Sequence, residues 1–245
     1  MSAIAEAFNT ADEHGGKYLS TPHLPFSPGK HEDDTLLSAD AAASGRLFNE
    51  EVAITEKLDG GNCCIARGVV YARSHKHPAT HPWFGTLKSM HHVLAATLDD
   101  DTLEIFGENI TTVHSIEYSA LTSYFYVFGV RRLGQWLAWA EVKLAADALG
   151  LPTVPVRFQG RLRAMPALET LILSGMAVPS ACGTQRPEGF VVRVAGAFAT
   201  SEFAHCVAKY VRPEHVQTGD DFTRIWPKTK RTWLKATLHK SDAAA

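Results

Sequence analysis

The sequence is poor in cysteine and contains no long apolar run. Its four cysteines are too few for a disulfide-stabilised scaffold, and their spacing forms no Cys-x-x-Cys pair. No apolar stretch approaches the ~18 residues that a membrane span needs. The first residues also lack the basic start and apolar block of a secretory signal. These absences favour a reducing compartment, so we expect a cytoplasmic protein without a membrane partner.

A charge excess of either sign is missing as well. The 245 residues carry 24 Lys and Arg against 26 Asp and Glu, a net charge of −2. The chain as a whole therefore does not indicate a nucleic-acid partner, although a basic subregion can hide in such a balance. A 45% hydrophobic composition is enough for a sizeable core. We expect one large domain over residues 1–222, followed by a short basic segment over 223–245.

The C-terminal segment differs from the rest in composition. Residues 224–241 include six basic side chains and no acid. Trp226 and Trp233 lie between the basic residues. Basic groups contact phosphates and indole rings stack on bases, so the pattern predicts a phosphate-contacting element. The alternative is a solvated tail whose tryptophans pack on the core.

Strand-like and helix-like patterns alternate irregularly along the chain. Apolar alternation predicts strands over 51–58, 102–109, 123–131, 188–194 and 205–212, with two short strands around Gly68. Helical periodicity predicts helices over 83–98, 135–150 and 165–175. The second helix is expected to bury an apolar stripe made of Trp136, Leu137, Trp139, Val142 and Leu144. Without regular βαβ repetition, the pattern predicts an α+β fold with largely antiparallel sheets.

The stretch ITEKLDGGNCCI places a lysine, Lys57, at the end of a strand and before a glycine turn. A lysine is a nucleophile only when deprotonated, and partial burial or nearby positive charge lowers its pKa from about 10.4. Asp59 is placed to orient the amine or contact a ligand, and Gly60 and Gly61 allow close approach. The alternative is an ordinary exposed lysine at a hairpin turn.

Further charged residues stand at strand positions downstream, namely Arg73, Glu108, Glu188 and Lys209. Charges are rarely buried without partners, so an inward cluster of this kind is poorly explained as core. It suits a nucleoside triphosphate site, in which carboxylates hold a divalent metal and sugar hydroxyls while basic groups hold phosphate. Phe128 is placed to stack on a base.

In this order the motifs resemble those of the covalent nucleotidyltransferases, which include polynucleotide ligases and capping guanylyltransferases. The resemblance covers about residues 20–215, and its motifs are KLDG at Lys57, an arginine at Arg73, FGEN at Glu108, YFYVFGV at Phe128, EGFVVR at Glu188 and AKYVR at Lys209. It implies a nucleotidyltransferase fold of antiparallel sheets flanked by helices. It also implies that Lys57 becomes adenylylated and that Glu188 and Glu108 bind Mg²⁺ or Mn²⁺.

Glu56 and Asn62 make the stretch similar to the EKxDGxN pattern of small nick-sealing RNA ligases. This similarity implies an ATP-dependent RNA ligase that transfers AMP to an RNA 5′-phosphate and joins it to a 3′-hydroxyl. Its partners would be RNA ends and, by extension, end-healing enzymes. The implied catalytic residues are Lys57, Asp59 and Lys209. The implied nucleotide-binding residues are Glu56, Asn62, Arg73, Glu108, Phe128, Glu188, Lys209 and Arg212. RNA contacts are expected from Arg224, Lys228, Lys230 and Arg231.

Two positions depart from the family pattern. Many relatives carry an acid after the aromatic residue, where this chain has Gly129, and many end on Lys-x-Lys, where it has Val211 after Lys209. Arg212 is a substitute for the second lysine, but strand alternation directs it away from Lys209. The short stretch after Lys209 leaves no room for the oligonucleotide-binding barrel of DNA ligases and capping enzymes, which favours a minimal RNA ligase.

Other functions remain open from the sequence. A guanylyltransferase or a DNA ligase uses the same lysine chemistry, but Asn62 and the short C-terminal stretch argue against both. A non-catalytic module that binds a nucleotide or an RNA end is opposed by the intact Lys57, Glu108, Glu188 and Lys209. The histidine-rich stretch around His77 and His81 fits no structural zinc spacing, so we expect a substrate-facing loop there.

Overall fold

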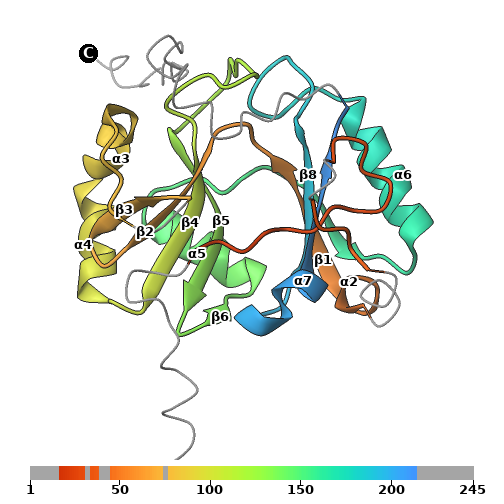
Figure 1. Ribbon diagram of the computed structural model, residues 1–245, viewed down its shortest axis with the longest axis horizontal. Coiled ribbons are helices and arrows are strands. Elements are labelled where there is room, and N and C mark those ends of the chain that lie inside the picture. The colour runs from red at the N-terminus through yellow and green to blue at the C-terminus, as the bar shows by residue number, and fades with distance from the viewer. Residues whose placement is uncertain (1–16, 31–33, 39–44, 74–76, 214–245) are drawn as a thin grey trace, which may run out of the picture.

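The computed structural model describes residues 17–30, 34–38, 45–73 and 77–213. In this part of the chain, two antiparallel sheets lie side by side, as Figure 1 shows, with α3 and α4 at the outer edge of one and α6 at the outer edge of the other. The predicted α+β class with largely antiparallel sheets is confirmed. The predicted boundary near residue 222 falls outside the described residues.

The smaller sheet has the strand order β10-β8-β1-β7. Its strands are β1 (Glu51–Lys57), β7 (Val156–Arg161), β8 (Gly189–Val194) and β10 (Val207–Val211). Helix α6 (Met165–Met176) places Leu168 and Ile172 in the same apolar cluster as Phe190 of β8. Strand β1 lies between β8 and β7 and is buried from Val52 to Glu56, and the half-buried Lys57 follows at its end.

The larger sheet has the strand order β3-β2-β4-β5-β6-β9. Its strands are β2 (Gly61–Ala66), β3 (Val69–Ala72), β4 (Leu103–Asn109), β5 (Phe125–Arg132), β6 (Gln135–Trp136) and β9 (Phe198–Ala199). Helix α5 (Trp139–Ala148) packs Trp139, Val142 and Ala146 into the core of this sheet. The remaining short helices are α2 (Arg46–Asn49), η1 (Pro82–Phe84), α3 (Gly85–Lys88), α4 (His91–Asp99), η2 (Thr200–Glu202) and α7 (Phe203–Cys206).

Two predicted helices differ from the observed ones. The expected helix over 83–98 is three short elements, η1, α3 and α4, with a break at Ser89 and Met90. The expected helix over 135–150 begins only at Trp139, because residues 135–136 pair with both β5 and β9 as β6. Within the expected stripe, Leu144 is 69% exposed and therefore not core. Strand β7 was not predicted.

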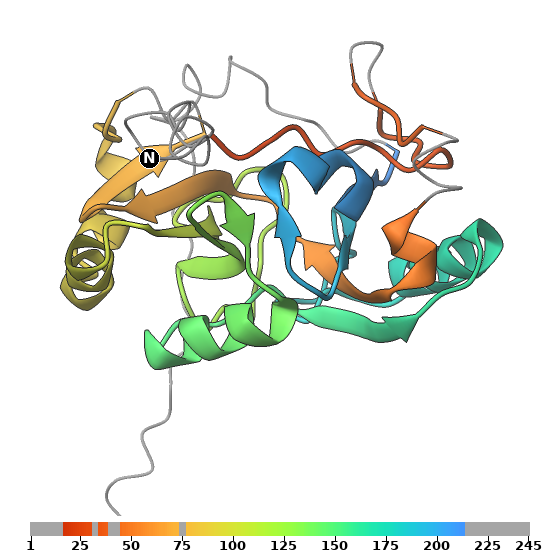
Figure 2. The same cartoon turned by 90° about the horizontal axis from the view of Figure 1, so that it is seen from below.

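An N-terminal strap, defined here as residues 17–30 and 34–38, runs along the opening between the sheets. It follows the red ribbon in Figures 1 and 2. The Lys209 N–H donates to the Pro22 carbonyl at 2.8 Å, and the Leu24 N–H donates to the Lys209 carbonyl at 2.8 Å. The strap therefore extends the smaller sheet beside β10. Among the described helices, none is long and apolar enough to cross a membrane.

Candidate active site

A cavity of about 730 Å³ lies between the two sheets and the strap. Most of the residues that the sequence assigned to a nucleotide site line this cavity: Glu56, Lys57, Asp59, Asn62, Arg73, Glu108, Phe128, Glu188 and Lys209. They come from segments up to 152 positions apart (209 − 57), which the two sheets bring together. Arg224, Lys228, Lys230 and Arg231 lie outside the described residues.

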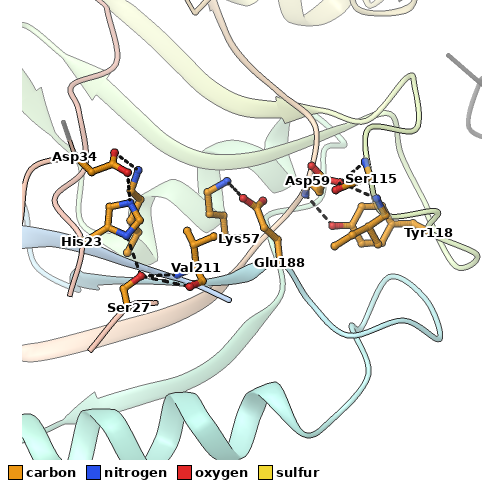
Figure 3. Close-up of polar contacts among 11 residues, drawn as sticks. His23, Ser27, Asp34, Lys57, Asp59, Ser115, Tyr118, Glu188 and Val211 are labelled. Atoms are coloured by element: carbon orange, nitrogen blue, oxygen red, sulfur yellow. Dashed lines mark hydrogen bonds and ion pairs between the residues drawn. The ribbon is translucent and has the colours of Figure 1, made fainter. Parts of the chain in front are cut away.

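Lys57 and Glu188 form an ion pair inside the cavity (Figure 3). The Lys57 ammonium donates to Glu188 Oε1 at 2.6 Å. The pairing follows from sheet register, because Lys57 lies opposite Gly189, the residue after Glu188. Burial alone would lower the pKa of Lys57, but the carboxylates of Glu188, Glu108 and Asp59 outweigh it and leave the pKa raised. In this state Lys57 is a charged ammonium, not a free amine.

Glu108 projects into the cavity from β4, opposite Asn62 of β2. Burial raises its pKa to about 8, and the nearby carboxylates of Glu188 and Asp59 act in the same direction. A carboxyl with a raised pKa is protonated near pH 7, and a bound divalent cation would favour its charged form. Mg²⁺ is usually bound by one or two carboxylates together with substrate phosphates, so Glu188 and Glu108 fit such an ion. A ready-made group of three or more metal-ligating side chains does not occur in the described chain.

Asp59 holds a loop of the cavity wall. Its Oδ2 accepts hydrogen bonds of 2.7 Å from Ser115 N, Ser115 Oγ and Ile116 N, and its own N–H donates to the Tyr118 hydroxyl at 2.8 Å (Figure 3). Its neighbour Gly60 has to be glycine, because a Cβ there would lie 2.5 Å from the Asn109 carbonyl oxygen. The Asp59 carboxylate therefore anchors this loop, and the expectation that it orients the lysine amine or contacts a ligand stays a prediction.

Glu56 also lines the cavity, but its carboxylate is bound by protein groups, and its part in nucleotide binding stays a prediction. Adjacent residues of a strand face opposite sides, so the side chain of Glu56 lies on the other face of β1 from Lys57. It accepts hydrogen bonds from Arg157 Nε at 2.6 Å, Ser180 Oγ at 2.6 Å and Ala181 N at 2.8 Å. Its carboxylate is fully buried and is used to hold the segment before Glu188 against β1.

Arg212, also predicted to bind the nucleotide, lies beside the strand that carries Lys209, and its predicted role stays a prediction. It follows the end of β10, and it is absent from the residues that line the cavity in the described structure. Its N–H donates to the Glu188 carbonyl at 3.0 Å, so its backbone supports Glu188. Three positions separate it from Lys209, and strand alternation places the two side chains on opposite faces.

One end of the cavity is aromatic. Tyr18 of the strap packs edge-on against Phe128, with ring centroids 5.0 Å apart, and against Phe203 at 5.2 Å. Burial raises the pKa of Tyr18 to about 12, so its hydroxyl is neutral. Arg193 of β8 is buried beside this group, where burial lowers its pKa to about 10 while its guanidinium donates to the Leu137 carbonyl at 2.8 Å. This end offers ring surfaces and a cation to a planar base.

Tyr18 and Arg193 line the cavity but were not among the predicted site residues. Tyr18 belongs to no recognised motif. The sequence could have indicated Arg193, because it is the last residue of the EGFVVR motif. It also lies two positions after Val191, another lining residue, and therefore on the same face of the strand. Asn62, which was predicted, also places a buried Oδ1 there that has no protein hydrogen-bond partner.

The structure shows what surrounds Gly129 and Val211, the two positions that depart from the family pattern. A Cβ at Gly129 would lie 3.1 Å from the Trp136 ring, so this tryptophan occupies the space that an acidic side chain would need. Val211 is buried under the strap, where its N–H donates to Ser27 Oγ at 2.9 Å and its carbonyl accepts from Gly29 N at 3.0 Å. The strap therefore covers the position of the missing second lysine.

Comparisons with known proteins place these motifs in a family. The RNA ligase family model matches residues 50–211. A Naegleria gruberi RNA ligase structure superposes with a TM-score of 0.55 at 15% identity, covering 82% of this chain and 56% of that one. An archaeal ATP-dependent RNA ligase gives 0.54 at 20% identity, covering 86% and 56%. A Naegleria gruberi RNA ligase variant with ATP and Mn gives 0.52 at 14% identity, covering 90% and 68%.

These likenesses show the fold. The chain spans little more than half the length of the first two of these structures. No protein with a curated description matches the chain.

Proposed function

Because the chain belongs to the RNA ligase family, we propose that it is an ATP-dependent RNA ligase that works through a lysyl-adenylate at Lys57. The observation that carries the proposal is the pairing of Lys57 with Glu188 inside a cavity that also contains Glu108, Phe128 and Lys209. A structural lysine has no need of such surroundings. The aromatic end of the cavity suits the adenine base. The basic side chains of Arg73 and Lys209, which also line the cavity, suit the triphosphate.

The first step would form one bond and break one. Deprotonated Lys57 Nζ attacks the α-phosphorus of ATP, so a P–N bond forms while the bond to the β-phosphate oxygen breaks and pyrophosphate leaves. Lys209 also lines the cavity and would stabilise phosphate charge. The raised pKa of Lys57 means that its pairing with Glu188 has to be released before the attack.

A divalent cation held by Glu188 and Glu108 would neutralise their carboxylates and screen phosphate charge. The structure with ATP and Mn belongs to a Naegleria gruberi RNA ligase variant of similar fold, which supports ATP and Mg²⁺ or Mn²⁺ for this chain. In the later steps AMP would pass to an RNA 5′-phosphate, and a 3′-hydroxyl would displace it to seal the strand.

RNA ends are the substrate class that the family supports, and end-healing enzymes are the partners we propose for preparing those ends. The basic segment, with Arg224, Lys228, Lys230 and Arg231, is proposed to contact RNA phosphates.

Labelling with radioactive ATP or GTP tests the proposal. The purified chain, with Mg²⁺ or Mn²⁺, is expected to acquire acid-stable label from ATP and to pass it to a 5′-phosphorylated nicked RNA duplex. Label from GTP alone would favour a capping enzyme, and transfer to nicked DNA alone would favour a DNA ligase. ATP binding without covalent label would identify a non-catalytic binding module.

A further inference from the structure

A line of polar contacts joins Ser27, His23 and Asp34 of the N-terminal strap (Figure 3), and Asp34 lies near Lys209. Asp34 Oδ1 lies 3.7 Å from Lys209 Nζ, and Asp34 Oδ2 lies 3.2 Å from His23 Nε2. On its other side, His23 Nδ1 lies 2.8 Å from Ser27 Oγ. His23 is fully buried: its Nδ1 is hydrogen-bonded to Ser27, whereas its Nε2 makes a close polar contact with Asp34 that falls short of hydrogen-bond geometry.

Ser27 and Asp34, the two ends of this line of contacts, both contact residues of β10. Ser27 Oγ accepts the Val211 N–H at 2.9 Å, and Asp34 reaches the side chain of Lys209 on the same strand. The strap also pairs with the backbone of Lys209 through Pro22 and Leu24. One segment therefore holds both the backbone and the side chain of Lys209.

The hydrogen bonds indicate the tautomer of His23. Ser27 Oγ already accepts from Val211 N, and its hydroxyl lies closer to His23 Nδ1, at 2.8 Å, than to the Val211 carbonyl, at 3.4 Å. With the hydroxyl donating to Nδ1, the ring proton is on Nε2, which faces Asp34. Burial, followed by the charge of Lys209, lowers the pKa of His23 to about 4, so the ring is neutral near pH 7. A neutral ring can hold the carboxylate without cancelling its charge.

We propose that Asp34 is a positioning residue for Lys209 and that His23 holds Asp34 in place. The inference rests on the proposed function, in which Lys209 faces the phosphates of ATP. A lysine stem has many rotamers, and a fixed carboxylate selects those that keep the ammonium in the cavity. It also opposes the repulsion that Lys209 experiences from Lys57 and Arg73. Asp34 and His23 precede residues 50–211, the segment that matches the family model. They are therefore not among the residues that the family model matches.

Single-turnover formation of the lysyl-adenylate tests the proposal. Asp34→Asn is expected to lower the rate at saturating ATP about tenfold, because a misplacement of about 1 Å can cost up to about a hundredfold. The ATP concentration for half-maximal rate should not rise, since a negative charge has left the surroundings of the triphosphate. Asp34→Glu should restore part of the rate. Asp101→Asn, at an exposed turn, is the matched control and should react like wild type.

Two further measurements separate positioning from simple stabilisation of the strap. In a Lys209→Ala background, Asp34→Asn should have no additional effect on the rate, because the two residues act together. In the ATP-free protein, acylation of Lys209 by an amine-reactive reagent, followed by peptide mass spectrometry, should be faster in Asp34→Asn than in wild type. Acylation of the exposed Lys143 serves as the internal reference.

The proposal is overturned if Asp34→Asn reacts like wild type, if its effect on the rate persists without Lys209, or if the acylation of Lys209 is unchanged. A wild-type chain that forms no adduct from ATP would contradict the proposed function instead. In that case the acylation experiment still decides whether Asp34 holds Lys209.

Discussion

At the scale of single residues, a shared motif does not imply a shared task. Glu56 and Lys57 are adjacent and both line the cavity, but the lysine ammonium pairs with Glu188 whereas the glutamate carboxylate accepts from buried Ser180. The motif EKLDG therefore combines a reacting group with groups that hold the surrounding chain. Only the hydrogen-bond partners of each side chain separate these roles.

Glu56 provides a direct test of this distinction. Glu56→Ala should reduce the free energy of unfolding by about 2–4 kcal/mol, because it leaves Arg157 and the hydroxyl of buried Ser180 without their carboxylate. Chemical denaturation measures the change, with exposed Glu51→Ala of the same strand as the control, expected within about 0.5 kcal/mol of wild type. If the variant has normal stability but needs a much higher ATP concentration for half-maximal rate, Glu56 acts in nucleotide binding instead.

The sequence indicated the cavity residues that stand in motifs, including Lys57, Glu108, Glu188 and Lys209. It did not indicate Tyr18, His23 or Asp34, because these depend on where the strap docks, and no local pattern encodes that. Tyr18 precedes a proline-rich stretch that reads only as a loop, although its ring packs against the cavity aromatics.

At the scale of elements, strands in which apolar and polar residues alternate were predicted well. Edge strands and very short elements were not. The pattern of 188–194 corresponds to β8, and that of 165–175 to α6. Strand β7 was missed because it is a largely exposed edge strand whose partner, β1, lies about a hundred positions earlier. The helix predicted from 135 lost its first turn because Leu133 and Gly134, both at positive φ, make a tight turn into β6.

The strap should make stability depend on pH through His23. The pKa of this histidine is lowered from 6.5 to about 4 in the folded chain, beside Asp34 and Lys209. Between these two values the unfolded chain binds a proton that the folded chain does not, so stability is complete above about pH 6.5 and falls as pH decreases toward 4. The full contribution is on the order of 3 kcal/mol.

Thermal unfolding of wild type and His23→Gln at several pH values between about 7 and 4.5 measures this dependence. The variant, which cannot titrate, should lose less stability on acidification than wild type, and His205→Gln, at an exposed position of α7, should behave like wild type. Parallel curves for wild type and His23→Gln would exclude His23 as a source of the pH dependence.

At the scale of the whole molecule, the described chain forms the cavity and the proposed RNA contacts fall outside it. A chain that ends at Asp221 should still form the lysyl-adenylate but bind and seal a nicked RNA duplex poorly, because it lacks the basic segment. Its binding should also weaken less steeply with salt, since fewer phosphates are neutralised. Filter binding over a salt series measures this, with a full-length chain carrying glutamine at Lys228, Lys230 and Arg231 as the matched variant. Full sealing by the shortened chain would assign RNA binding to the domain surface alone.

Lys57 is the group that receives AMP in the proposed reaction, and every later step depends on it. Intact-protein and peptide mass spectrometry after incubation with ATP and Mg²⁺ should find the mass of one AMP on the peptide that contains Lys57. Lys57→Arg keeps the positive charge beside Glu188 but cannot act as a nucleophile, because a guanidinium is not deprotonated in proteins. This variant should remain folded, bind ATP and carry no adduct. An adduct on a different residue, or one that persists in Lys57→Arg, would contradict the account.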